Sequence, residues 1–136
     1  MEGIIRRLQH IGVPVTDLEK SEAFYHRLGF KNAMSATFDH QSDKGNVAMM
    51  ELNGIIIELY QLPEAALAEI GSRRNGHVDH IAFDVEDIEQ TFAVLKENEF
   101  HILEVAPVFL PFWETGCRYF NILGPDGERL EFNQIL

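Results

Sequence analysis

The stretch His10–Phe30, HIGVPVTDLEKSEAFYHRLGF, returns 70 positions later as His80–Phe100, HIAFDVEDIEQTFAVLKENEF, without a gap. Seven positions are identical in the two copies: His10/His80, Ile11/Ile81, Val15/Val85, Asp17/Asp87, Glu19/Glu89, Ala23/Ala93 and Phe30/Phe100. We infer an internal duplication, so the fold of one half predicts the fold of the other.

Each copy predicts a strand followed by a helix. An apolar stretch of strand length comes first, and then an Asp that can cap a helix, followed by apolar residues at helical spacing. In the first copy either Thr16 with Glu19 or Asp17 can form the cap, and Gly29 fits a left-handed helix end, which predicts a helix over 17–28. The counterpart of Gly29 is Glu99, so we expect the second helix to end differently.

The two halves also end alike, because an apolar-flanked Glu follows a turn glycine by four residues in both, at Glu58 and at Glu131. Three further strands are predicted in each half. In the first they are 30–39, 47–52 and 55–61, with a polar loop at 40–46 and an Asn53-Gly54 hairpin. In the second they are 100–105, 119–123 and 128–134, with a loop at 107–118 and a turn at 124–127.

Each half is therefore predicted to form a βαβββ module, and the whole sequence predicts an α+β protein. We expect two tandem modules whose curved mixed sheets enclose a metal-binding cavity. The chain would be one domain, with module one at about 5–62, a linker with a short helical turn at 63–76, and module two at about 77–136.

Composition limits the function classes. The net charge is −11, with 22 acidic and 11 basic residues, which opposes binding to a phosphate backbone. No apolar run is long enough to cross a membrane. The single cysteine, Cys117, excludes an internal disulfide, in agreement with a reducing compartment. We expect a soluble cytoplasmic protein that binds neither nucleic acid nor membranes.

Strand alternation gathers four residues of metal-ligand type on one side of the predicted sheets. In the first strand Ile11, Val13 and Val15 face the helix, so His10 faces away from it. Glu58 lies on the equivalent face of an apolar strand, where an ionised carboxylate needs a partner or a metal. Symmetry then places His80 and Glu131 likewise. Two imidazoles and two carboxylates predict a site for a divalent ion.

Such an ion polarises a bound carbonyl, and a nearby glutamate can then take a proton from the adjacent carbon. This chemistry suits an isomerase, an epimerase or a lyase. The substrate would be a small oxygenated molecule. Tyr60, on the face of Glu58, and the aromatic loop residues Phe112 and Trp113 are candidate substrate contacts, although the loop aromatics could equally close the core or a dimer contact. Arg118 could clamp a carboxylate or phosphate, or lie on the surface.

Four motifs resemble the vicinal oxygen chelate superfamily, also called the glyoxalase/bleomycin resistance/dioxygenase family. They are Leu8-Gln-His-Ile-Gly-Val, Phe24-Tyr-x-x-Leu-Gly-Phe, Asp79-His-Ile-Ala-Phe-Asp-Val and Gly124-Pro-Asp-Gly-x-x-x-Glu. The resemblance covers about 8–134. It implies paired βαβββ modules and a divalent metal at their open face. We also expect a homodimer.

Within that family the set His10, Glu58, His80 and Glu131 resembles glyoxalase I. The resemblance implies nickel or zinc, with cobalt, manganese or iron as other candidates, and a glutamate as the catalytic base, Glu131 before Glu58. Glutathione-specific members usually carry an Arg just after the first His. Here Val13 and Pro14 occupy those positions, so we do not expect the methylglyoxal–glutathione adduct as substrate.

Two other functions stay open. The chain could be a small-molecule binding or resistance protein without turnover, although such relatives usually lack the metal ligands. It could also be an iron-dependent ring-cleaving dioxygenase, which would need only His10, His80 and Glu131. Glu58 argues against this second alternative, since it fills a position that oxygen or substrate would need.

Overall fold

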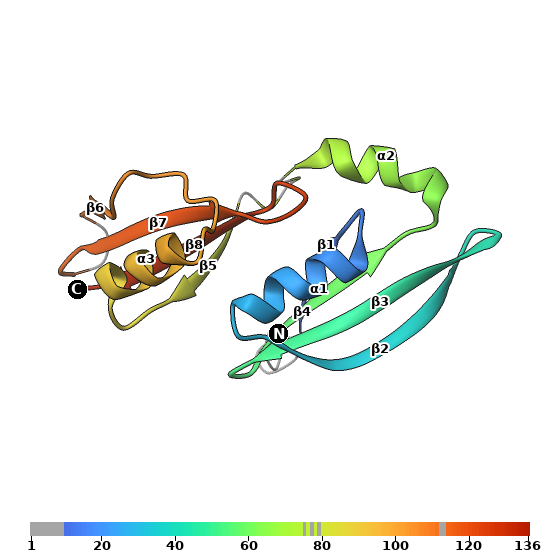
Figure 1. Ribbon diagram of the computed structural model, residues 1–136, viewed down its shortest axis with the longest axis horizontal. Coiled ribbons are helices and arrows are strands. Elements are labelled where there is room, and N and C mark those ends of the chain that lie inside the picture. Colours follow the sequence, from blue (N-terminus) through green and yellow to red (C-terminus); the bar gives the residue numbers. More distant parts are fainter. Residues whose placement is uncertain (1–9, 75, 77, 79, 112–113) are drawn as a thin grey trace, which may run out of the picture. The chain divides into compact units, whose positions relative to one another are not determined.

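The repeated stretch forms the same strand and helix in both halves of the computed structural model, which describes residues 10–74, 76, 78, 80–111 and 114–136. The chain divides into two units, Met1–Arg73 and Arg74–Leu136, and each is described by itself (Figure 1). The first contains β1 (Ile11–Pro14), α1 (Leu18–Arg27), β2 (Lys31–His40), β3 (Asp43–Leu52), β4 (Ile55–Gln61) and α2 (Glu64–Arg73). The second contains β5 (Ile81–Asp84), α3 (Ile88–Glu97), β6 (Val108–Leu110), β7 (Cys117–Leu123) and β8 (Arg129–Ile135).

Each unit holds one four-stranded mixed sheet. The strand orders are β1-β4-β3-β2 and β5-β8-β7-β6, with the first and last strands of each module parallel and the other neighbours antiparallel. The helix of each module packs on one face, α1 against β2, β3 and β4, and α3 against β7 and β8. The predicted α+β class and the two βαβββ modules are confirmed.

The buried residues alternate along the strands as the sequence predicts. Ile57 and Leu59 in β4 are fully buried under α1, as is Leu130 in β8 under α3. In the second unit the core is aromatic, because Phe120 stacks on Phe132 and meets Phe92 of α3 edge to face. These apolar faces leave the other face of each sheet for polar side chains.

The two module helices begin alike. Asp17 and Asp87 are the N-caps, and their carboxylates accept the N–H groups of Lys20 and Gln90. The last strand of each module supplies a second acceptor to the helix start. Gln61 Oε1 accepts from Leu18 N at 2.7 Å, and Gln134 Oε1 accepts from Ile88 N at 3.0 Å. Each helix is thereby tied to the strand that carries the glutamate of its module, β4 or β8.

The two helices also end alike, so the expected difference between Gly29 and Glu99 is wrong. Gly29 has φ +100° and donates to His26 O, while Phe30 N donates to Tyr25 O. Glu99 adopts φ +58° and makes the same bond to Lys96 O, and Phe100 N donates to Leu95 O. This pattern is the Schellman motif. Burial of the phenylalanine that follows holds Glu99 in a conformation that its side chain disfavours.

Two predictions about the first unit need correction. The expected polar loop at 40–46 is a turn of two residues, Gln41 and Ser42, because β2 and β3 continue into it. The polar residues there are compatible with a strand since β2 is an edge strand that solvent reaches. The predicted turn at Asn53-Gly54 is confirmed, with φ values of +50° and +82°. The short helical turn expected after Pro63 is the ten-residue helix α2.

In the second unit the strand expected at 100–105 is absent, and the short strand β6 lies within the expected loop. Only Ile102 forms an isolated bridge there, with Ile122. The reason is Glu104, whose carboxylate accepts the backbone N–H of Asn121 at 2.6 Å, in place of the carbonyl that a neighbouring strand would supply. The turn at Gly124–Gly127 is confirmed by a Gly127 N to Gly124 O bond. No helix among the described residues is long and apolar enough to span a membrane.

The shared helix end predicts opposite effects for two substitutions. Gly29→Ala should lower the free energy of unfolding by about 1 kcal/mol, because alanine disfavours positive φ. A Cβ there would meet only Leu52, at 3.8 Å, so the cost is conformational. Glu99→Gly should be neutral or stabilising by less than about 1 kcal/mol. Urea unfolding of both variants checks this, and a destabilising Glu99→Gly would contradict the shared geometry.

Candidate functional site

The first candidate pair, His10 and Glu58, is brought together by the pairing of β1 with β4. Gly12 lies beside Glu58 in this parallel ladder, and His10 precedes Gly12 by two residues, so all three share the face opposite α1. His10 Nε2 lies 2.8 Å from Glu58 Oε2. Gly12 has no side chain, so no side chain at position 12 separates the imidazole of His10 from the carboxylate of Glu58.

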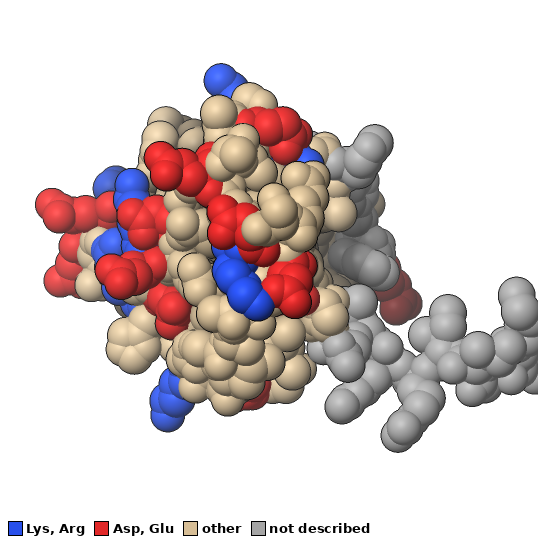
Figure 2. Space-filling view, turned by 90° about the vertical axis from the view of Figure 1, so that its right-hand side faces the viewer, with Lys and Arg blue, Asp and Glu red and all other residues tan. Residues whose placement is uncertain are grey.

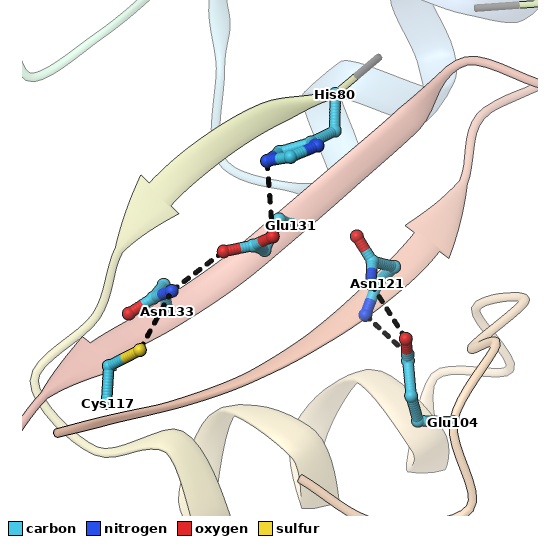
Figure 3. Close-up of polar contacts among 6 residues, drawn as sticks. All are labelled: His80, Glu104, Cys117, Asn121, Glu131 and Asn133. Carbon is cyan, nitrogen blue, oxygen red and sulfur yellow. Dashed lines mark hydrogen bonds and ion pairs between the residues drawn. The ribbon is translucent and has the colours of Figure 1, made fainter. Parts of the chain in front are cut away.

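The second pair, His80 and Glu131, repeats this arrangement. Ala82 lies beside Glu131 in the β5/β8 ladder, and His80 precedes Ala82 by two residues. His80 Nε2 lies 3.3 Å from Glu131 Oε2 (Figure 3). The four residues predicted from the repeat therefore form two pairs, one in each unit. Within each unit the described His, Cys, Asp and Glu side chains form no group of three that could hold a metal.

A cavity of about 660 Å³ opens on the second pair. This volume lies within the range of small-molecule sites, about 300 to 1,000 Å³. Its wall combines the pair with polar side chains from the neighbouring strands and a few apolar ones. It includes Tyr119, Asn121, Arg129, Asn133, Glu104, Leu103 and Leu110. None of these had a predicted role, although alternation along β7 and β8 places Tyr119, Asn121 and Asn133 on the face of Glu131.

Two side-chain amides in this cavity are oriented by carboxylates. Asn121 Nδ2 donates to Glu104 Oε1, and Asn133 Nδ2 donates to Glu131 Oε1, both at 2.7 Å (Figure 3). An ionised carboxylate only accepts hydrogen bonds, so both amides must present nitrogen to it. Their Oδ1 atoms are buried and have no hydrogen-bond partner among the described residues. Both amide residues line the cavity beside Glu131.

A smaller cavity, about 390 Å³, adjoins the first pair. Glu58 and Tyr60 line it together with His40 at the end of β2 and Arg73 at the end of α2. Tyr60, a predicted substrate contact, lines this cavity, and its role stays a prediction. Arg73 is held by Glu69 at 2.7 Å, and this hydrogen bond lowers the pKa of Glu69 from its ordinary value. The sequence assigned no role to Arg73, because α2 was expected to be shorter.

Arg118, for which both anion binding and a surface position were expected as alternatives, forms its contacts outside the cavity. Arg118 lies in β7 on the face that packs against α3, where it pairs with Glu89 and donates to Pro107 O at 3.5 Å. It does not line the cavity beside Glu131. The neighbouring Tyr119 takes the cavity side, since residues alternate along a strand. Phe112 and Trp113, the other two candidate substrate contacts, lie outside the described residues.

The face drawn in Figure 2 carries charged side chains of both signs. Acidic side chains gather over its left, upper and central parts, with basic side chains among them, and its lower part is mostly uncharged. The chain as a whole carries a net charge of −11. Binding to a phosphate backbone needs clustered Lys and Arg, so the exclusion of nucleic acid as a partner stays a prediction from the net charge.

Comparison with known proteins adds a family to this geometry. The sequence model of the Glyoxalase/Bleomycin resistance protein/Dioxygenase superfamily matches residues 7–132. The uncharacterized protein YwkD of Bacillus subtilis (strain 168) is 29% identical over 132 residues, covering 94% of this chain and 96% of that protein.

Two solved structures show the same fold. The glyoxalase family protein from Bacillus cereus superposes with a TM-score of 0.73 at 20% identity, over 98% of this chain and 96% of that one. The trypanothione-dependent glyoxalase I of Leishmania major does so with a TM-score of 0.67 at 24% identity, over 94% and 86%. At these identities the likeness concerns the fold alone.

The contact between Glu104 and Asn121 can be tested by measuring the free energy of unfolding. Glu104→Leu removes the acceptor for two buried donors of Asn121 and should lower the free energy of unfolding by about 1 to 3 kcal/mol. Glu104→Gln keeps one acceptor oxygen and should cost less. Glu114→Leu, at an exposed loop position, should change it by less than about 0.5 kcal/mol. Urea unfolding measures all three, and equal effects of Glu104→Leu and Glu114→Leu would refute the interpretation.

Proposed function

Because the chain belongs to the glyoxalase/bleomycin resistance protein/dioxygenase superfamily, we propose that it is a metal-dependent lyase or isomerase of glyoxalase I type. Its two His/Glu pairs together would hold one divalent ion. The ligands would be His10, Glu58, His80 and Glu131. The observation that carries this proposal is the repetition of the pair, at the same register of the same two strands, in both units.

The pairs fit a metal in their chemistry, and the second pair also fits in its spacing. Two ligands about 2.1 Å from one ion lie about 3.0 to 3.4 Å apart, depending on the coordination angle. The nitrogen and oxygen atoms of the second pair, 3.3 Å apart, lie in this range, while those of the first pair, 2.8 Å apart, lie at hydrogen-bond distance. Imidazole and carboxylate together suit zinc and nickel, which we favour, and also cobalt, manganese or iron. Without an ion, each imidazole can donate a hydrogen bond to its carboxylate.

The proposed reaction is proton abstraction next to a carbonyl. The ion would supply Lewis acidity that stabilises negative charge on the carbonyl oxygen. One of the two glutamates, Glu58 or Glu131, would take the proton on a carboxylate oxygen and return it to the substrate. Both carboxylates are suited to this role since each lies beside a cavity that a small substrate could enter.

The substrate proposal follows the two cavities. Tyr60 would contact a small oxygenated substrate beside Glu58, and Arg73 is a new candidate contact there. Phe112 and Trp113 stay candidates from the sequence. We do not propose the methylglyoxal–glutathione adduct, because Val13 and Pro14 stand where glutathione-specific relatives carry arginine. A homodimer in the cytoplasm completes the proposal, and the single, buried and unoxidised Cys117 is compatible with that compartment.

Metal content tests the ligand set. Untagged protein purified without chelator should contain about one nickel, zinc, cobalt or manganese ion per chain. The double variant His10→Ala/Glu131→Ala should contain none, because each pair loses a ligand. If each pair held its own ion, His10→Ala alone would leave half of the metal. Iron with oxygen uptake would instead indicate a dioxygenase, and no metal in either protein, even after adding each ion, would leave a binding protein without turnover.

Proton exchange tests the chemistry without knowledge of the natural substrate. Zinc-loaded protein in D₂O should speed the exchange of the C–H protons of hydroxyacetone, followed by proton NMR. Replacing the catalytic glutamate by Gln should slow this by about 100-fold or more. The exposed helix residue Glu97 gives the control variant Glu97→Gln, which should exchange at the normal rate. If neither Glu58→Gln nor Glu131→Gln slowed exchange, the proposed base would be wrong.

A further inference from the structure

The two His/Glu pairs differ in how the carboxylate is held. In the second unit Glu131 uses its two oxygens for different partners, since Oε1 accepts from Asn133 Nδ2 at 2.7 Å while Oε2 faces His80 at 3.3 Å (Figure 3). In the first unit the described residues give Glu58 one side-chain partner, His10. A hydrogen bond from a side-chain amide therefore orients the carboxylate of Glu131, and among the described residues no such bond orients that of Glu58.

The difference arises from one position. Asn133 and Tyr60 each follow the glutamate by two residues, and the backbone around them is the same. Tyr60 O accepts from Val15 N, and Asn133 O accepts from Val85 N, both at 2.9 Å. The ring of Tyr60 lies over Gly12, with Cε1 3.5 Å from where a glycine Cβ would stand. The side chain at this position, Asn133 or Tyr60, therefore decides whether the glutamate receives an amide hydrogen bond.

Asn133 is itself well fixed. Its Nδ2 also lies 3.8 Å from Sγ of Cys117, which is fully buried, so the amide is held between this sulfur and the carboxylate (Figure 3). The side chain of Glu131 is also the less exposed of the two glutamates, at 13% against 26% for Glu58. A carboxylate held in this way loses little freedom when a ligand binds to its second oxygen.

We propose that Asn133 is a positioning residue that makes His80 and Glu131 the tighter half of the metal-ligand set. Hydrogen bonds that orient a metal-binding carboxylate typically change metal affinity by about 10 to 100-fold. Glu58 lacks such an orienting hydrogen bond, so it is the glutamate that can release the ion and turn toward a substrate. This inference rests on the proposed metal site, and it reverses the order of the two glutamates as base that the family resemblance implies.

The test compares the same substitution at the two equivalent positions. Full-length Asn133→Leu and Tyr60→Leu are titrated with zinc against a chelating dye. Asn133→Leu should weaken zinc binding by about 10 to 100-fold, the effect expected for an orienting partner of a metal ligand. Tyr60→Leu should leave the affinity unchanged within about 3-fold, since it removes no bond to Glu58. Thermal unfolding of both variants without metal shows whether a change in fold explains the result.

A second pair of variants avoids Asn133 altogether. Glu131→Gln should weaken zinc binding more than Glu58→Gln does. Equal losses in this pair, or equal affinities of Asn133→Leu and the unaltered protein, would overturn the inference while the metal site itself stands. If the unaltered protein bound no zinc or other divalent ion, the proposed function would fail, and the inference with it.

Discussion

The parallel pairing of the first strand of each module with its last strand is the constraint on which the site depends. It sets Gly12 beside Glu58 and Ala82 beside Glu131, and because side chains alternate along a strand, it brings a histidine from two residues earlier to the same face. A shift of either ladder by one residue would turn the glutamate toward the helix. Two contacts at the strand end hold the register: a backbone bond from Val15 or Val85, and a glutamine side chain at the helix start.

The parts of the fold that local sequence determines could be predicted from the repeat. Asp17 and Asp87 cap their helices, Asn53-Gly54 forms the tight turn, and the buried face of β4 follows the alternation of its apolar residues. The errors lie where a distant contact overrides local preference. Glu104 occupies a place in the ladder beside Asn121, which is remote in sequence, and Glu99 accepts a positive φ because Phe100 must be buried.

The candidate site also contains residues whose placement follows from the sequence and residues whose placement does not. The positions of His10, Glu58, His80 and Glu131 follow from symmetry and strand alternation, and each pair lies within contact distance. Arg118 was placed in a loop, so alternation could not show that it faces α3 and pairs with Glu89. The hydrogen bond from Asn133 to Glu131 is also not predictable from the sequence. Its place on the face of Glu131 could be read from the sequence, but its bond depends on an amide whose orientation only the neighbouring carboxylate and sulfur define.

The strand pairings described here all join residues of the same unit, and this has a consequence for how the protein is made. The ladder of β1 and β4 spans Ile11 to Tyr60, so the first sheet has all of its strands once Gln61 has left the ribosome. Units that contain all of their own strand pairings generally fold as units, the N-terminal one first during synthesis. His10 and Glu58 can thus meet on a nascent chain whose second glutamate, Glu131, has not yet been translated.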